Sequence, residues 1–345
     1  MDNRYSPEQL ALRTATAALA SDLGPRTVED LDDGARRAKL TAAGADAGWW
    51  WLRAAGEDGG PMASGVEVAI VARELARAAA DTPFLGPVVA ADLARAAGVD
   101  LGDAAATVVL SPSLLDFAEI DPQSATEGIA IDSAGIAPAF VLRRAPDSPD
   151  TYQLVQITLG ESSPCTDLTR SIERVALDVD TGAVVGEPIG QAAVDRARAL
   201  ASTVTVADLV GSMEAALDTT CEYARERQQF GVAIGSFQAV QHLLAEARVL
   251  VEGAISVAQY ASWAVDAREP ADALEAVSVA KAYCADAART VCETAIQVHG
   301  GIGNTWECFV HVHLRRALFA SAVMGDDGHH LRVLATNRMG FSHGL

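Results

Sequence analysis

Residues 297–307 read Gln297-Val298-His299-Gly300-Gly301-Ile302-Gly303-Asn304-Thr305-Trp306-Glu307, and they separate two helical segments of the chain. An Ala-rich run with a helical pattern begins near Pro270 and ends in these three glycines, and the helical segment that follows carries Arg315 and Arg316. Glycine has no Cβ, so such a cluster allows a sharp turn and lets a ligand approach main-chain amides. Short glycine-rich patterns are common, and these residues fit a helix C-cap followed by a turn equally well.

A second pattern lies upstream of this run. It reads Tyr223-Ala224-Arg225-Glu226-Arg227-Gln228-Gln229-Phe230-Gly231, followed by Ile234-Gly235-Ser236-Phe237-Gln238-Ala239-Val240-Gln241-His242. Together the two patterns resemble the two C-terminal signatures of the acyl-CoA dehydrogenase family, in the family's order and at a typical separation. In the N-terminal part the resemblance is weaker and rests on Glu57-x-Gly59-Gly60 and Glu74-Leu75-Ala76-Arg77-Ala78.

Periodic patterns divide the chain into three parts. Residues 1–102 are helical in pattern, with an amphipathic helix that starts at Gly65. Residues 103–188 contain short β-prone runs between Pro, Asp, Ser and Gly: 107–110, 128–131, 139–143, 152–159 and 173–179. Residues 189–345 return to long helical segments: 191–229, 236–267, 270–298, 306–324 and 326–339. We therefore expect a mainly α protein, with a small antiparallel β domain between an N-terminal helical domain and a C-terminal four-helix bundle, which is the layout of an acyl-CoA dehydrogenase.

Size and charge limit the classes of function. A chain of 345 residues, half of them hydrophobic, is long enough to build two or three packed layers. The formal net charge of −20 argues against nucleic acid, which requires clustered Lys and Arg. The first residues lack an apolar signal core, no stretch of about 18 apolar residues is uninterrupted, and the five cysteines form no C-x-x-C pair. We expect a cytoplasmic protein with reduced thiols and no membrane segment.

The resemblance implies a cofactor and the residues that contact it. In the family, flavin adenine dinucleotide (FAD) lies at a dimer contact, where the β domain of one subunit holds the isoalloxazine and the bundle of its neighbour reaches the diphosphate and adenosine. Arg227 would then bind the neighbour's diphosphate, because a guanidinium stays charged and presents a fork of donors. The other implied contacts are Phe230, Phe237, Gln238, Gln297, Gly300 and Gly301. Without the resemblance, Arg227 is better explained as a solvated arginine near a helix C-terminus, where the helix dipole favours a cation.

The histidines offer no comparable metal site. His311 and His313 are two residues apart on an expected helix, so they point to different faces and make a poor ligand pair. The adjacent pair His329-His330 has the same defect. We expect these to be packing or surface histidines, and we expect no metal.

The family's catalytic base is missing from both positions at which it occurs. Family members remove the α-proton of an acyl-CoA with a glutamate while the flavin accepts the β-hydride. In most members this glutamate belongs to a Glu-Gly pair after the glycine-rich motif, and the matching pair here is Met324-Gly325. In other members it lies 26 residues upstream of the diphosphate arginine, at Ala201, and the adjacent arginine of the thioester site is replaced by Ser202. Neither Met nor Ala accepts a proton, so this chain lacks the family's general base.

The β domain departs from the family as well. The Thr-Glu-Pro…Gly-Ser-Asp loop and the Trp-Ile-Thr segment that surround the flavin ring in family members are absent between Asp103 and Pro188. Only Asp167 to Asp178 resembles the later part of that domain. The chain thus keeps the half-site that it would donate to a neighbour and lacks the half-site that it would use itself.

The favoured interpretation is the shorter, degenerate subunit of an actinobacterial heterotetrameric (α2β2) acyl-CoA dehydrogenase, which completes the FAD site of a catalytic partner subunit. Such an enzyme would desaturate an acyl-CoA in the β-oxidation of fatty acids or steroid side chains, with electron-transfer flavoprotein as acceptor. The loss of one site is chemically coherent, because each flavin site draws on both subunits. Two alternatives remain open: a homomeric flavoenzyme whose base is Asp326, Asp327 or Glu307, and a flavin-free scaffold.

Overall fold

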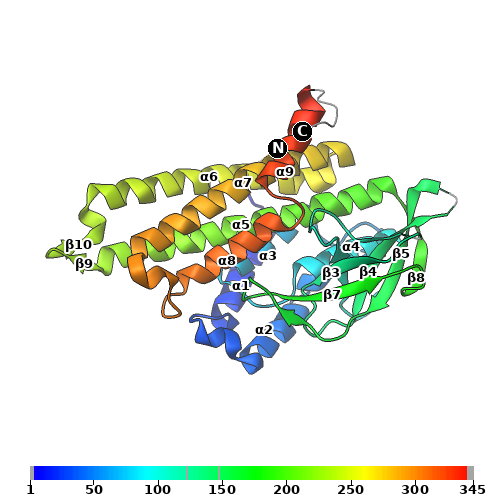
Figure 1. The fold of residues 1–345 in the computed structure, drawn as a ribbon, viewed down its shortest axis with the longest axis horizontal. Coiled ribbons are helices and arrows are strands. Elements are labelled where there is room, and N and C mark those ends of the chain that lie inside the picture. Colours follow the sequence, from blue (N-terminus) through cyan, green and yellow to red (C-terminus); the bar gives the residue numbers. More distant parts are fainter. Residues whose placement is uncertain (1–3, 122, 147, 340–345) are drawn as a thin grey trace.

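Helices from both ends of the chain pack together, and the sheet formed by the middle part of the chain lies at one end of them (Figure 1). The computed structural model describes residues 4–121, 123–146 and 148–339. The N-terminal helices are α1 (Pro7–Leu23), α2 (Gly34–Asp46), α3 (Gly65–Arg77) and α4 (Leu85–Ala96), with the short 3-10 turns η1 (Glu29–Asp32) and η2 (Trp49–Trp51). The C-terminal helices are α5 (Gln191–Glu226), α6 (Gln238–Ala267), α7 (Pro270–His299), α8 (Val310–Ala322) and α9 (Asp327–Met339), with the 3-10 turns η3 (Ile234–Ser236) and η4 (Gly300–Asn304).

The sheet is mainly antiparallel and has the order β6-β7-β3-β1-β4-β5-β8, with β2 beside β4. Its strands are β1 (Thr107–Leu110), β2 (Glu119–Ile120), β3 (Thr126–Ile131), β4 (Pro138–Ala145), β5 (Ser148–Thr158), β6 (Ser163–Pro164), β7 (Ser171–Leu177) and β8 (Ala183–Gly190). Two pairs, β1 with β4 and β2 with β4, are parallel. The sequence patterns gave no signal for β2, β6 and β8, because β2 and β6 are only two residues long and β8 is exposed along most of its length.

Helix α5 is the centre of the C-terminal bundle and packs against α3, α6, α7 and α8. Figure 1 shows α5, α6 and α7 running beside one another, with the sheet at one end. Among the described residues, α5 alone is long and apolar enough to cross a membrane, but 94% of its most apolar window is buried by the other elements, as in the core helix of a bundle. Gly211 lets α3 approach closely, because a Cβ there would lie 2.2 Å from the carbonyl oxygen of Arg73.

A buried cluster of charged side chains joins the three parts of the chain. Asp208 of α5 accepts two hydrogen bonds from Arg316 of α8 (2.8 and 2.9 Å) and one from Arg170, which precedes β7 (2.5 Å). Arg170 also reaches Asp132, directly after β3 (2.8 Å). Arg316 donates in addition to the carbonyl of Ala80, beyond the end of α3 (3.0 Å). One carboxylate thus anchors two guanidiniums that contact the bundle, the sheet and the N-terminal helices.

The carboxylates of this cluster differ in proton affinity. Burial raises the pKa of Asp167, which accepts hydrogen bonds from the N–H and hydroxyl of Thr169 (2.9 and 2.7 Å). Burial also acts to raise the pKa of Asp208, but Arg316 and Arg170 outweigh it and lower that pKa. Asp208 is therefore the carboxylate that keeps its charge and on which the cluster depends.

Replacement of Asp208 by asparagine should lower the free energy of unfolding by about 3–5 kcal/mol, because it removes one partner from two buried guanidiniums. Chemical denaturation followed by circular dichroism measures this difference. The matched control is Asp286→Asn, which removes an exposed carboxylate paired with Arg289 and should change stability by less than about 1 kcal/mol. Similar small losses in both variants would show that the cluster does not hold the parts together.

Candidate functional site

Arg227 is the residue at which α5 ends. Its backbone is extended (φ −68°, ψ 124°), its N–H donates to the carbonyl of Tyr223 (2.8 Å), and its carbonyl accepts from the N–H of Ile234 (2.8 Å). These two bonds fix the position of the residue between α5 and the segment that follows. The side chain is exposed, and no ion pair within the described part of the chain involves it. Its charge is therefore available to a ligand from outside the chain.

A short hairpin projects beyond Arg227, where the sequence had predicted that α5 would continue to residue 229. It consists of β9 (Gln228–Gln229) and β10 (Val232–Ala233), and Phe230 and Gly231 form its turn with positive φ angles (55° and 82°). The turn places the Phe230 ring at the tip, where it is 92% exposed and meets the ring of Phe237 edge-on at 6.3 Å. Gln238, also exposed, begins α6 directly after Phe237. A phenylalanine held this far from the core suits a surface that another molecule covers.

The glycine-rich turn follows α7. Gly300 adopts φ 66° and ψ −142°, a conformation that favours glycine, and it opens η4. Gly303 is buried, and a Cβ there would lie 2.7 Å from the carbonyl oxygen of Ile296. A Cβ at Gly301, in contrast, would meet nothing within 4 Å, so packing within the chain does not require glycine at this position. Gln297, in the last turn of α7, has an exposed side chain.

The ends of α5 and α7 are joined by aromatic stacking. The rings of Tyr223 and His299 lie 4.3 Å apart with an interplanar angle of 18°, and His299 Nδ1 lies 2.8 Å from the carbonyl oxygen of Ala295. Figure 1 shows the β9–β10 hairpin at the same end of the bundle as the turn between α7 and α8. The structure thus brings to one end of the bundle all seven residues predicted to contact FAD, and their contact with a cofactor remains a prediction.

The two positions expected for a catalytic base lie elsewhere, in the core. Ala201 is 1% exposed on α5, and Met324 is 4% exposed beyond the end of α8. Met324 and Gly325 both have positive φ angles (61° and 93°), and His330 Nε2 lies 2.8 Å from the Met324 carbonyl oxygen. Neither position lines the two cavities described below.

The loop between β1 and β2 covers this region, a contact that the sequence gave no reason to expect. The carbonyl of Leu114 accepts a hydrogen bond from the N–H of Met324 (2.7 Å). Two residues later, the carboxylate of Asp116 accepts two bonds from Arg198 (2.7 and 2.8 Å), which lies one helical turn before Ala201. The chain's own loop is therefore attached beside both base positions.

Lys281 of α7 also holds this turn. Its ammonium nitrogen is fully buried and donates to the carbonyls of Ala320, Ser321 and Val323 at 2.8, 3.1 and 2.8 Å. These are carbonyls at the C-terminal end of α8, where the helix leaves acceptors unsatisfied. Burial lowers the pKa of Lys281 to about 7. The backbone at Met324 is thus fixed by α7 as well as by the β1–β2 loop.

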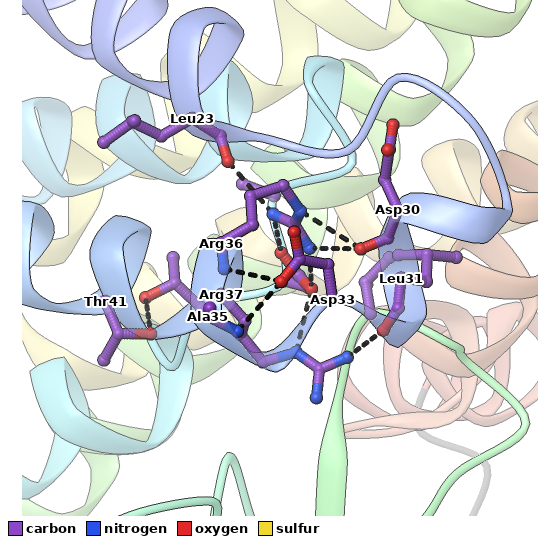
Figure 2. Close-up of polar contacts among 12 residues, drawn as sticks. Leu23, Asp30, Leu31, Asp33, Ala35, Arg36, Arg37 and Thr41 are labelled. Carbon is purple, nitrogen blue, oxygen red and sulfur yellow. Dashed lines mark hydrogen bonds and ion pairs between the residues drawn. The ribbon is translucent and has the colours of Figure 1, made fainter.

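A large cleft of about 1160 Å³ lies between α2, the segment after α3, the loop after β3 and the loop before β7. Its charged lining is Glu29, Asp32, Asp81, Asp132 and Glu307 against Arg37 and Arg170. Arg36 and Arg37 of α2 both bond to Asp81 (2.6 and 2.8 Å). Figure 2 shows the polar contacts of these two arginines with the segment before α2. Because carboxylates outnumber arginines, the cleft suits a neutral or cationic ligand better than a phosphate.

His311 and His313 pack within the fold. The His311 ring meets Trp306 edge-on at 5.2 Å, and the His313 ring meets Phe309 at 5.7 Å. Burial lowers the pKa of His313 to about 4, so that this ring is neutral at pH 7. Within the described residues, no group of three His, Cys, Asp or Glu side chains is arranged to hold a metal ion.

Comparisons with known proteins agree with this architecture. The family model for the acyl-CoA dehydrogenase C-terminal domain matches residues 192–339. The acyl-CoA dehydrogenase FadE34 of Mycobacterium tuberculosis is 41% identical over 138 residues, which are 40% of this chain but only 19% of FadE34. The acyl-CoA dehydrogenase IpdE2 of the same organism is 29% identical over 327 residues and 90% of each chain. In the solved ChsE4–ChsE5 complex of M. tuberculosis, a chain 23% identical to this one matches it over 100% of both lengths with a TM-score of 0.80.

Residues 192–339 therefore match the acyl-CoA dehydrogenase C-terminal domain, and the chain as a whole is similar to acyl-CoA dehydrogenases such as IpdE2. The predicted fold class, mainly α with a small β domain as in acyl-CoA dehydrogenases, is confirmed.

The stability contributed by Lys281 should depend on pH. The pKa of an unfolded lysine is about 10.4, and in the folded chain it is about 7. Between these values the unfolded state binds a proton that the folded state does not, so the stability of the wild type rises with pH, by up to about 1.4 kcal/mol per pH unit. Lys281→Met lacks this contribution, and the difference in unfolding free energy between wild type and variant should grow in favour of the wild type from pH 7 to pH 9.

Denaturant titrations at several pH values measure this difference. Lys39→Met makes the same chemical change at an exposed position and should give a difference that does not vary with pH. A constant difference for Lys281→Met would mean that the three carbonyls keep the buried ammonium protonated.

Proposed function

We propose that this chain is a subunit of an FAD-dependent acyl-CoA dehydrogenase, and that it completes the FAD site of a partner subunit without supplying the catalytic base. The observation that carries the proposal is the contrast between its two half-sites. The end of the bundle with Arg227 and the glycine-rich turn is exposed and holds an unpaired charge. The base positions Ala201 and Met324 are buried and carry no acid, and the chain's own β1–β2 loop bonds to Met324 and to Arg198, near Ala201.

The residues at the exposed end fit the diphosphate and adenosine portions of FAD. Arg227 offers a guanidinium that no acidic side chain of the described residues neutralises, and charge-assisted bonds of this kind are worth about 1.5–3 kcal/mol each. Gly300 and Gly301 leave the backbone bare, and at Gly301 the absence of a side chain serves no packing within the chain. Gln297 adds an amide, and Phe230, Phe237 and Gln238 provide rings and an amide beside it. Bound FAD would accept the β-hydride when an acyl-CoA is desaturated.

The partner we propose is a catalytic acyl-CoA dehydrogenase subunit with its own glutamate and a complete flavin loop. Apolar side chains of the hairpin and α6 are exposed: Phe230, Val232, Phe237, Leu243 and Val249. A second chain that covered them would remove this apolar surface from water. The ChsE4–ChsE5 structure, a complex of two proteins, supports a heteromer. We further propose a fatty acyl-CoA or steroid side-chain substrate, electron-transfer flavoprotein as acceptor and a cytoplasmic location.

Arg227→Ala should strip FAD from the assembled complex while the subunit stays folded, because only the diphosphate contact is lost. The ratio of flavin to protein absorbance measures the FAD content. Arg225→Ala is the matched control, since it removes an exposed arginine from the last turn of the same helix. If both variants keep the flavin content of the wild type, Arg227 is a solvated arginine and the proposed site is wrong.

Asp326→Asn should leave turnover of the complex within a few-fold of the wild type, because the proton-abstracting acid belongs to the partner. Asp326 caps α9 by accepting the N–H of His329 (2.7 Å), and asparagine is an equally good cap, so the fold is preserved. Loss of a general base typically costs about 10²–10⁴-fold. Glu307→Gln should be as mild, whereas substitution of the partner's glutamate should abolish α-proton exchange in deuterated buffer. A collapse caused by Asp326→Asn with FAD still bound would instead favour the homomeric alternative, with the base in this chain.

A further inference from the structure

A second cavity, of about 520 Å³, lies beside the first turn of α5. It is bounded by the loop before α3, the last turn of α4 and the joint between α6 and α7. Its charged lining consists of three guanidiniums and two carboxylates: Arg53, Arg95, Arg196, Asp92 and Asp266. Helix α5 has 36 residues, so this cavity and Arg227 lie at ends of the helix that are roughly 50 Å apart. The cavity is thus separate from the proposed FAD contact.

The two carboxylates of the cavity are already used. Asp266 accepts from both terminal nitrogens of Arg53 (3.0 and 2.9 Å) and from the N–H of Gly65 at the start of α3 (2.7 Å). Asp92 accepts from Arg53 Nε (3.0 Å) and from Arg95 Nη2 (2.8 Å). Arg53, which is fully buried, forms ion pairs with both carboxylates that face the cavity.

The other two guanidiniums keep donor capacity: Arg95 is paired with Asp92 through Nη2 alone, and Arg196 has no carboxylate partner among the described residues. Arg95 Nε is buried and has no hydrogen-bond partner within the described residues. Arg196 donates to the carbonyls of Val265 and Arg268, which are neutral acceptors, and no carboxylate of the described residues lies within ion-pair distance of it. The cavity therefore has an excess of one positive charge in a chain of net charge −20.

The first turn of α5 adds to this field. The helix begins at Gln191, its N-cap is Gly190, and no side chain caps its first turn. Ala192 and Ala193 line the cavity, so the positive end of a long helix faces the guanidiniums.

We propose that this cavity binds the phosphate group of a small metabolite. Guanidinium forks next to a helix N-terminus are a common phosphate-binding arrangement, because donors and positive potential converge on the same point. The volume exceeds that of a phosphate ion, which leaves room for the rest of the ligand near Pro61 and Met62. In a strongly acidic protein, a local excess of positive charge selects this place for an anion.

Titration calorimetry of the full-length chain with inorganic phosphate and with glycerol 3-phosphate, at constant ionic strength, tests the proposal. We expect one saturable site per chain, and about tenfold or weaker binding in Arg95→Gln and in Arg196→Gln, since each change removes a charge-assisted donor. Arg289→Gln removes an exposed guanidinium paired with acids outside the cavity and should bind phosphate as the wild type does. Tighter binding of glycerol 3-phosphate identifies a phosphate ester as the ligand, and equal binding identifies the ion itself.

Three results would overturn the proposal: no saturable binding of either probe, binding that is unchanged in Arg95→Gln, and an equal loss in Arg289→Gln. Arg196 bonds to carbonyls at the end of α6, so its variant is checked by circular dichroism. Arg95→Gln removes no such contact with the backbone and gives a decisive result even if Arg196→Gln is unstable.

Discussion

The carboxylate of Asp208 is shared by Arg316 and Arg170, and this buried contact sets the positions of the three parts of the chain relative to one another. Withdrawing a charge from water costs several kcal/mol, which is recovered only when geometry and additional hydrogen bonds are good. Here the additional bonds go to Asp132 after β3 and to the carbonyl of Ala80 after α3. A displaced sheet or N-terminal layer would leave a guanidinium buried without its acceptor. The arrangement of the helices around the sheet is therefore fixed by polar contacts as well as by apolar packing.

The proposed asymmetry between the two half-sites rests on what the Arg227 end of α5 and the middle of the bundle contain. At the Arg227 end, the chain leaves exposed a charge, the ring of Phe230 and a glycine, Gly301, that its own packing does not require. The backbone at Val323 and Met324 is hydrogen-bonded by three elements. The β1–β2 loop and His330 of α9 bond to Met324, and Lys281 of α7 bonds to the carbonyl of Val323. A chain that had to bind substrate at Met324 would need space there, and this chain has filled it with hydrogen-bonded backbone. The exposed end and the closed middle of the bundle support the proposal that this chain contributes residues to the FAD site of a partner subunit.

Much of the architecture could be predicted from the sequence, because its signals are local. Pro270 fits the start of α7, and Gly300 supplies the positive φ that ends it. The end of α5 was misplaced by three residues, since a phenylalanine at positive φ in a hairpin turn runs against turn preferences. The stacking of Tyr223 on His299, the three carbonyls around Lys281 and the Leu114–Met324 bond join residues far apart in the chain, and no pattern in a single sequence reports such pairs. Even Asp208, on which the fold depends, looks in the sequence like a polar interruption of an apolar helix.

The exposed tip at Phe230 has a consequence for the subunit before it assembles. A free copy presents an aromatic hairpin and an apolar stripe of α6 to water, the kind of surface that self-association and cellular quality control act upon. In the proposed complex, the partner subunit would cover both surfaces. The cellular lifetime of this polypeptide would then be set by how soon it meets its partner, and an excess of either chain would be removed instead of stored.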